Sequence, residues 1–400
     1  MRTITKLLLA LLLVTAVGTA ALAQSAPPAA GSNLTIGLVM VGPYNDHGWS
    51  EANYAGLQYV LAKVPGTKMV YIDKANSADR PGTTVSQLAE GLLTQGAKLV
   101  IFSSDDFTDE AIKFAKAHQD IFVILTSGDQ QWKDGKNYQP MPNMINIMGK
   151  CEYMKFLAGA AAAMTTKTGK IGFLGPLIND ETRRLASSAY LGAKYAWTTY
   201  LKKDPTQLSF KVTWIGFWFN IPGVTSDPTQ VADYFFNSGY DVVISGIDTT
   251  EAVTEAAKYQ GQGKTVWAVP YDYANALDEN KNVSLGVPYY NWGPAYDKAV
   301  TAAMKGTWKN HFEYNGPDWK DINNPDTSAV GFKKGTLSPD ASAAVDKLVK
   351  ELAGGLNLWK GPLNLQDGSA YLKAGQAATD VQIWYLPQLL QGMEGQSVSK

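Results

Sequence analysis

The 400-residue chain contains one cysteine, Cys151, and only three histidines, His47, His118 and His311. A single cysteine excludes an internal disulfide, and the histidines match no zinc-binding spacing such as H-E-x-x-H. Charge of one sign is not in excess either, because 35 basic residues stand against 36 acidic ones. This balance excludes the basic surface that binds nucleic acid.

Long apolar runs are also scarce. The run Leu7–Val17 is too short for a permanent transmembrane helix. Two basic residues precede it and the motif Ala21-Leu22-Ala23 follows, which is the pattern of a cleaved secretory signal. We therefore expect residues 1–23 to be a signal peptide and residues 24–33 to be a flexible lead-in. No cysteine follows the cleavage site directly, so we expect a periplasmic protein without a lipid anchor.

Catalytic motifs are missing as well. No G-x-S-x-G nucleophile elbow occurs. The segment Gly261–Thr265 (GQGKT) resembles the end of a phosphate loop, but Lys258 stands where the leading glycine belongs. A strand is expected after this segment, whereas a phosphate loop precedes a helix. We therefore predict that the protein is not an enzyme and needs no metal or cofactor.

The composition that is present is that of a globular protein, with 45% hydrophobic and 18% charged residues. The length favours two domains. The chain also has 11 Trp and 20 Tyr. Such an aromatic load can supply both the cores and a surface on which a flat ligand stacks.

Predicted strands and helices alternate along the chain, which indicates parallel sheets. The first unit is a strand at Thr35–Val41, a polar loop and a helix at Ser50–Lys63. Two series of such units predict an α/β fold of two Rossmann-like lobes with a cleft between them and a hinge of several strands. We assign residues 34–146 plus 273–310 to lobe 1 and residues 147–272 plus 311–400 to lobe 2. A further strand is expected at Val283–Val287, and a last helix at Pro387–Met393.

Carboxylates and aromatic rings recur where the predicted strands end. Ligands bind at the carboxyl ends of strands in open α/β sheets, so these side chains are candidates for a binding site. Any one aspartate could instead cap the following helix, and Trp49 could be a hydrophobic staple. A flat heterocycle with N–H donors would use both rings and carboxylates. The candidates are Asp46, Trp49, Ser104, Asp105, Asp129, Trp218, Asp248 and Asp272.

Several segments resemble, in order and spacing, the basic membrane protein family of ABC-importer substrate-binding proteins. Asp46–Ser50 (DHGWS) is similar to the family's element after the first strand. Glu152–Met164 (EYMKFLAGAAAAM) is similar to its Phe-Leu-x-Gly-x-x-Ala-Ala helix. Further similar segments are Phe122–Asp129, Lys170–Gly175 with Arg184, Trp214–Trp218, Trp292–Tyr296 and Trp359–Gly368. The resemblance implies a type I periplasmic binding protein fold, and it adds Arg184 and Trp292 to the candidate site.

The best-known members of this family bind purine nucleosides. The resemblance therefore implies that a purine ring stacks on Trp49 and Trp218. It implies hydrogen bonds to the base from Asp129 and Ser50, and a ribose contact from Asp272.

Two positions depart from the family pattern. Ser50 stands where nucleoside binders usually have asparagine, and Pro288-Tyr289-Tyr290 stands where a lysine that contacts ribose is expected. A free nucleobase or another planar heterocycle is therefore at least as consistent with these residues as a nucleoside.

Together these observations predict a monomeric periplasmic substrate-binding protein that delivers a purine-like heterocycle to an ABC permease in the inner membrane. Nucleic acid is not an expected partner. An alternative is a periplasmic receptor component that senses the same class of ligand and reports to a membrane signalling partner.

Overall fold

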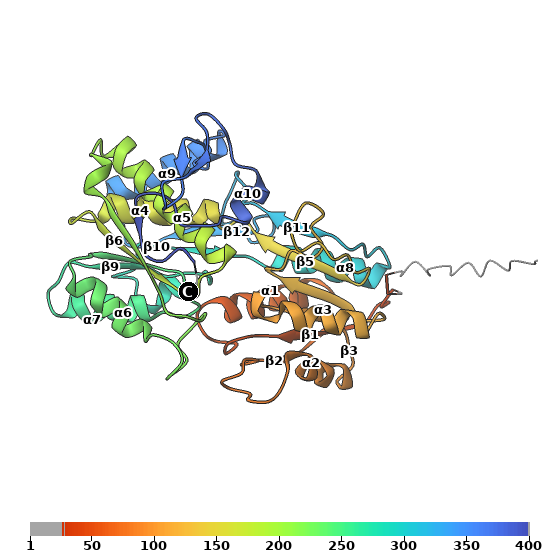
Figure 1. Ribbon diagram of the computed structural model, residues 1–400. Helices are drawn as coiled ribbons and strands as arrows, with labels where there is room; N and C mark the ends of the chain where they lie inside the picture. Colours follow the sequence, from red (N-terminus) through yellow and green to blue (C-terminus); the bar gives the residue numbers. More distant parts are fainter. Residues whose placement is uncertain (1–25, 28, 399–400) are drawn as a thin grey trace, which may run out of the picture.

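The computed structural model describes residues 26, 27 and 29–398, so the expected signal peptide lies outside the described residues. Helices and strands alternate and form two lobes that lie side by side (Figure 1). Each lobe is built on a parallel sheet, as the alternation predicts. Within the described residues, no helix is long and apolar enough to cross a bilayer.

The first lobe contains a six-stranded parallel sheet in the order β11-β5-β4-β3-β1-β2. Every residue of β4 and β5 is buried, as expected for strands covered on both faces. The strands are β1 (Leu34–Val39), β2 (Thr67–Ile72), β3 (Ala97–Phe102), β4 (Phe122–Thr126), β5 (Met144–Gly149) and β11 (Phe312–Asn315). The helices are α1 (Trp49–Lys63), α2 (Val85–Thr94), α3 (Thr108–Ala117) and α8 (Gly293–Lys305).

The second lobe contains a five-stranded parallel sheet in the order β15-β7-β6-β8-β9. Its strands are β6 (Lys170–Gly175), β7 (Ser209–Trp214), β8 (Val242–Ser245), β9 (Trp267–Val269) and β15 (Met393–Glu394). Its helices are α4 (Glu152–Thr165), α5 (Asp180–Tyr195), α6 (Pro228–Asn237), α7 (Glu251–Gly261), α9 (Pro339–Ala353) and α10 (Asp380–Trp384).

Helices α4 and α5 pack with their backbones in close contact. A Cβ atom at Gly159 would lie 1.9 Å from the Ala189 carbonyl oxygen, and one at Gly192 would lie 2.0 Å from the Phe156 carbonyl oxygen. Only glycine permits this approach. The small-residue stretch of α4 therefore places Lys155 and Glu152, on the same helix, deep in the second lobe.

The chain crosses between the lobes after β5, after β10 (Gly286–Tyr290) and before β12 (Val330–Lys334). Strands β10 and β12 pair antiparallel and form a two-stranded sheet. Two boundaries differ from the sequence assignment. Strand β11 pairs with β5, so residues 312–315 belong to lobe 1. The strand expected at Val283–Val287 begins at Gly286, while Leu285 donates its N–H to Ala268 in lobe 2.

The described part of the lead-in is packed against the first lobe. The Ala30 N–H donates to the Ala303 carbonyl of α8, at 3.0 Å. Pro27 is buried, and Ala26 contacts the core. Ala29 and residues 31–33 are exposed, so these contacts hold only part of the lead-in, and its flexibility stays a prediction.

The C-terminal segment, which follows α9, contacts both lobes. Its hairpin consists of β13 (Leu363–Asn364) and β14 (Ala370–Leu372), and its helix is α10. No helix forms at Pro387–Met393, which corrects the sequence prediction. Leu390 instead forms a bridge with Leu365, and Met393 belongs to the short strand β15 beside β7.

Aromatic packing joins this segment to the first lobe. The ring of Trp384 packs edge-on against Trp132 and Phe312, with centroid distances of 5.5 and 5.4 Å. The next residue, Tyr385, donates its hydroxyl to Asp129. Because Trp384 also lies against Arg184 in the second lobe, the C-terminal segment bridges the two lobes.

Strand β11 carries a carboxylate whose environment predicts a pH-dependent stability. Burial alone raises the pKa of Glu313, but hydrogen bonds from His311, Lys298 and Asn315 outweigh it and lower the pKa to about 2. Stability from a lowered carboxyl pKa is present above the unfolded-state value and is lost as the pH falls through the folded value. Glu313→Gln should therefore lower the free energy of unfolding at neutral pH by about 1–3 kcal/mol.

Urea unfolding at neutral pH and near the folded-state pKa would measure this effect. The difference between Glu313→Gln and the unmodified protein should shrink in acid. Exposed Glu394 is the matched control, and Glu394→Gln should change the stability by less than about 0.5 kcal/mol at either pH. A Glu313→Gln effect that is independent of pH contradicts the assignment.

Candidate functional site

The loop after β1 is organised by Asp46. Its carboxylate accepts the backbone N–H groups of Gly48, Ser50 and Glu51, each at 2.9 Å. N–H groups at the start of a helix have no acceptor within the helix, so the Asp46 carboxylate acts as the cap of α1. The Ser50 hydroxyl accepts the Gly42 N–H at 3.1 Å and is fully buried. Asp46 and Ser50 thus shape the loop that presents Trp49.

Trp49 is the first residue of α1 and is 6% exposed. Its indole N–H donates to the Ser103 carbonyl, 2.5 Å away at the end of β3. The rings of Tyr290 and Trp292 pack edge-on against it, both at centroid distances of 5.3 Å. These contacts orient the Trp49 ring toward the second lobe.

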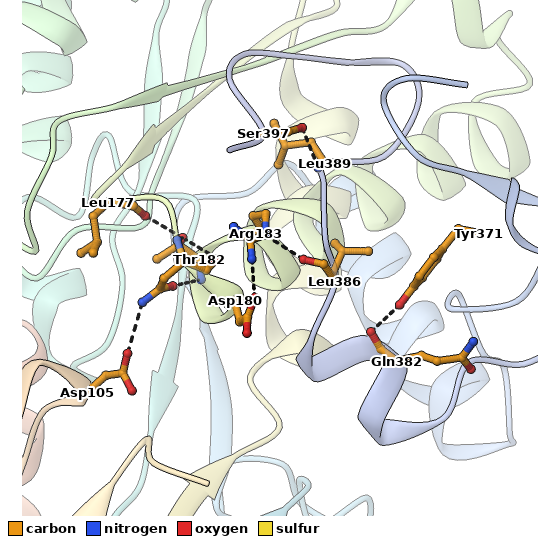
Figure 2. A network of polar contacts seen from close by, with 11 residues as sticks. Asp105, Leu177, Asp180, Thr182, Arg183, Tyr371, Gln382, Leu386, Leu389 and Ser397 are labelled. Atoms are coloured by element: carbon orange, nitrogen blue, oxygen red, sulfur yellow. Dashed lines mark hydrogen bonds and ion pairs between the residues drawn. The ribbon is translucent and has the colours of Figure 1, made fainter. Parts of the chain in front are cut away.

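The end of β3 and the start of α5 meet across the cleft. Ser104 and Asp105 follow β3 in the first lobe. The Asn179 side chain, which caps α5 in the second lobe, donates to the Asp105 carboxylate at 3.4 Å. Figure 2 shows Asp105 beside the first turn of α5, which carries Thr182 and Arg183. Asp105 thus lies where the two lobes come together.

Trp218 and Asp248 form the opposite wall. They follow β7 and β8 in the second lobe, and the Asp248 N–H donates to the Trp218 carbonyl at 2.9 Å. The indole nitrogen of Trp218 is buried and has no hydrogen-bond partner. A buried donor without a partner costs free energy, so this N–H is available to a ligand acceptor.

A second polar group lies after β9. Asp272 is 0% exposed, and neither of its carboxylate oxygens has a hydrogen-bond partner. Nearby, the Lys155 ammonium lies 3.2 Å from the centre of the Tyr271 ring and donates to the Ser245 carbonyl at 2.8 Å. The Lys155 ammonium and the Tyr271 hydroxyl both lower the pKa of Asp272, but burial outweighs them and raises it.

Two adjoining small cavities, each of about 10 Å³, lie between these walls. Trp49, Glu181, Trp218 and Asp248 line both of them. The first cavity is completed by Ser104, Asp105 and Ser127. The second is completed by Lys155, Phe173, Pro176, Thr182, Leu185, Gly246, Tyr271 and Asp272. Rings from both lobes and buried polar groups therefore face one enclosed space, as in small-molecule sites.

Burial shifts the pKa values of the lining groups. It raises the pKa of Asp105 to about 6 and that of Glu181 to about 7, with Arg184 opposing in both cases. Burial also raises the pKa of Asp248 and Asp272 well above the usual range for aspartate. Burial lowers the pKa of Lys155 to about 8. Perturbed groups gathered in one cleft indicate a functional site.

The structure brings six of the eleven candidate residues to the cavity walls, namely Trp49, Ser104, Asp105, Trp218, Asp248 and Asp272. The other five lie away from the walls. Asp46 and Ser50 hold the start of α1, as described above. Asp129 accepts hydrogen bonds from Tyr385 and from the side chains of Gln130 and Asn137.

The remaining two candidates, Arg184 and Trp292, pack behind the site. Arg184 forms a buried ion pair with Glu152, with Nε and Oε1 2.6 Å apart. Trp292 stacks on Tyr290 at 5.0 Å and supports Trp49. Both residues therefore position the walls from outside the cavities.

Sequence reasoning missed Lys155 and Glu181 as lining residues. Lys155 is the only cation in the apolar helix α4, and a lone charge among buried positions was the available signal. Glu181 lies in the first turn of α5, after Asn179 and Asp180. Its real position depends on α5 entering the cleft, which no local pattern reveals.

A known protein family and a purine-binding relative both match most of this chain. Residues 33–352 match the Bmp family, described as ABC transporter substrate-binding protein PnrA-like. A purine-binding protein of Brucella abortus is 24% identical over 360 residues, which cover 88% of this chain and 90% of that protein. This match agrees with the resemblance seen in the sequence.

Solved structures show the same fold. A solute-binding protein of an Aeropyrum pernix ABC transporter superposes with a TM-score of 0.64 at 13% identity, covering 83% of this chain and 93% of that one. A similar protein of Conexibacter woesei gives a TM-score of 0.58 at 16% identity, covering 80% and 97%. The prediction of a two-lobed α/β fold of the type I periplasmic binding class is confirmed.

Proposed function

Because this chain belongs to the Bmp family of PnrA-like ABC transporter substrate-binding proteins, we propose that it captures a planar, purine-like heterocycle between its lobes. The family itself is extracytoplasmic and hands small molecules to an ABC permease. The proposed ligand is a nucleobase or a nucleoside-like molecule. The purine-binding relative supports this class of ligand.

The observation that carries the proposal is the pair of indole rings shared by both cavities. Trp49 comes from the first lobe and Trp218 from the second. A flat ring bound between them would stack on both and would accept a hydrogen bond from the free Trp218 N–H. Asp248 and Asp272 would accept hydrogen bonds from the edge of the ring.

We infer that capture works by closure of the lobes, with no covalent step. The ligand would touch both lobes only when they are together, so it would favour the closed state through these additional contacts. The three crossovers near β10 and β12 would supply the hinge. A turnover assay with nucleosides tests the absence of catalysis, since release of a free base would contradict it.

We further propose that the mature protein starts after Ala23 and acts as a monomer in the periplasm without a lipid anchor. The sequence of the first 23 residues supports export. Mass spectrometry of the protein recovered from the cell envelope would give the mature N-terminus. Size-exclusion chromatography with light scattering would give its oligomeric state.

A thermal-shift screen over purine bases, nucleosides, sugars and amino acids tests the ligand class. A ligand that binds the folded state raises the melting temperature by mass action. We expect purines or related flat heterocycles to raise it. A response restricted to sugars or amino acids would refute the proposal.

Trp49→Ala should weaken binding of the purine that gives the largest thermal shift. Loss of stacking on one base face is worth about 1–3 kcal/mol, or roughly a 5- to 150-fold rise in Kd. Isothermal titration calorimetry would measure the change.

The matched control is Trp308→Ala. Trp308 is also 6% exposed and also donates its indole N–H to a backbone carbonyl, that of Pro142, but it lies away from the cavities. Both substitutions remove a buried indole and should lower stability similarly. Only Trp49→Ala should change the Kd, and an unchanged Kd would remove Trp49 from the site.

A further inference from the structure

The cleft has more acidic than basic side chains. Four carboxyl groups line the two cavities, namely those of Asp105, Glu181, Asp248 and Asp272. Lys155 is the single cationic side chain among the lining residues. The walls of an enclosed space therefore carry four acidic groups against one basic group.

The second layer does not restore the balance. Arg184 lowers the pKa of Asp105 and Glu181 from behind the wall, but its charge is shared with Glu152, at 2.6 Å. The Lys155 ammonium is held by the Ser245 carbonyl and the Tyr271 ring. The other titratable groups that face the lining carboxyls are carboxyl, thiol or phenol groups, namely Asp46, Asp106, Asp129, Cys151, Asp180, Glu251, Tyr271 and Tyr290.

The surroundings of Asp272 indicate which kind of ligand the cleft would bind. Its side chain is 0% exposed, lines the second cavity and has no hydrogen-bond partner on either oxygen. A buried ionised carboxylate without donors is unfavourable unless a cation or a proton compensates it. The charge of Lys155 lowers the pKa of Asp272, but its ammonium donates a hydrogen bond to the Ser245 carbonyl and none to Asp272.

We propose that the ligand is cationic: a flat heterocycle that carries a positive charge on a ring or amino nitrogen and donates N–H groups to Asp272 and Asp248. This inference rests on the proposed function, since it specifies which heterocycles the cleft prefers. The indole rings of Trp49 and Trp218 suit such a ligand, because the face of an indole attracts a cation.

Binding of a cation has a proton signature. Burial raises the pKa of Asp248 and Asp272 well above the usual range for aspartate, and a bound cation would lower it again. A cation favours their ionised forms and displaces protons on binding. Affinity for a permanent cation should therefore rise with pH, while affinity for a neutral base should change little.

Calorimetry with paired probes tests the proposal. One pair is 1-methyladenine, which binds a proton near neutral pH, and adenine, which stays neutral there. The second pair is 1-methyladenosine and adenosine, which carry the ribose that a nucleoside site would contact. We expect the cationic member of a pair to bind at least about tenfold tighter. Titrations in two buffers of different ionisation enthalpy should show proton release.

Asp272→Asn keeps the shape of the side chain and removes the charge. It should abolish the preference for the cationic probe, and it should leave the melting temperature of the empty protein unchanged or higher, because one buried acidic group is gone. Asp248→Asn is the second variant and should reduce the same preference. Exposed Asp109 on α3 provides the control, and Asp109→Asn should leave the preference intact.

Three results would overturn the inference. Equal binding of both members of each pair without proton release would do so while leaving the proposed function standing. So would a preference that survives in both aspartate variants. If no purine, charged or neutral, gives heat or a thermal shift, then both the inference and the proposed function fail.

Discussion

Replacing Arg184 by methionine should lower the free energy of unfolding by about 3–5 kcal/mol, because it leaves a buried carboxylate without its partner. Arg184 is 1% exposed and its Nε atom donates to Glu152, which is itself buried. The guanidinium also stacks on Trp384 of the C-terminal segment, 4.2 Å from the ring centre. Urea unfolding followed by circular dichroism would measure the loss.

Two further variants test whether the unpaired carboxylate causes this loss of stability. The double variant Arg184→Met/Glu152→Gln should recover about 2 kcal/mol, because glutamine removes the unpaired charge and keeps an acceptor for the Tyr314 hydroxyl. Arg183→Met should cost only about 1 kcal/mol, since Arg183 pairs with the more exposed Asp180. If Arg184→Met and Arg183→Met cost the same, the buried pair does not stabilise the protein in the way we describe.

Adding one methyl group at Gly48 should weaken ligand binding about 100-fold, or about 2.7 kcal/mol. Gly48 lies in the loop before α1, and a Cβ atom there would lie 1.7 Å from the Asp248 carbonyl oxygen in the other lobe. Real atoms do not approach so closely, so the lobes of Gly48→Ala would have to stay apart. Apparent affinity falls with the fraction of protein that can reach the binding-competent state.

Two measurements and one control variant test this effect. Calorimetry with the purine that gives the largest thermal shift should show the weaker binding. Small-angle X-ray scattering should show that this purine compacts the unmodified protein but not Gly48→Ala. The control is Gly91→Ala on α2, where a Cβ atom meets nothing within 4 Å. An unchanged Kd in Gly48→Ala would mean that this contact between the lobes is not needed for binding.

The architecture followed from local patterns. Apolar strands such as β4 can exist only inside a covered sheet, and their alternation with helices allows only parallel connections. Trp49 and Trp218 could be placed at the cleft because they follow strands, and strand ends meet at one edge of a sheet. The prediction failed at Pro387–Met393, where contacts with the distant β7 and Leu365 replaced a weak helical pattern.

The sequence by itself determined that this protein has two α/β lobes, that acidic and aromatic side chains follow its strands, and that it belongs with substrate-binding proteins. Only the tertiary structure decided which carboxylates face the cleft. Asp46 and Asp272 both follow a strand, yet Asp46 receives three backbone N–H groups and Asp272 receives none. The reason is that hydrogen-bond satisfaction depends on donors brought from other elements, and spacing along one chain does not encode them.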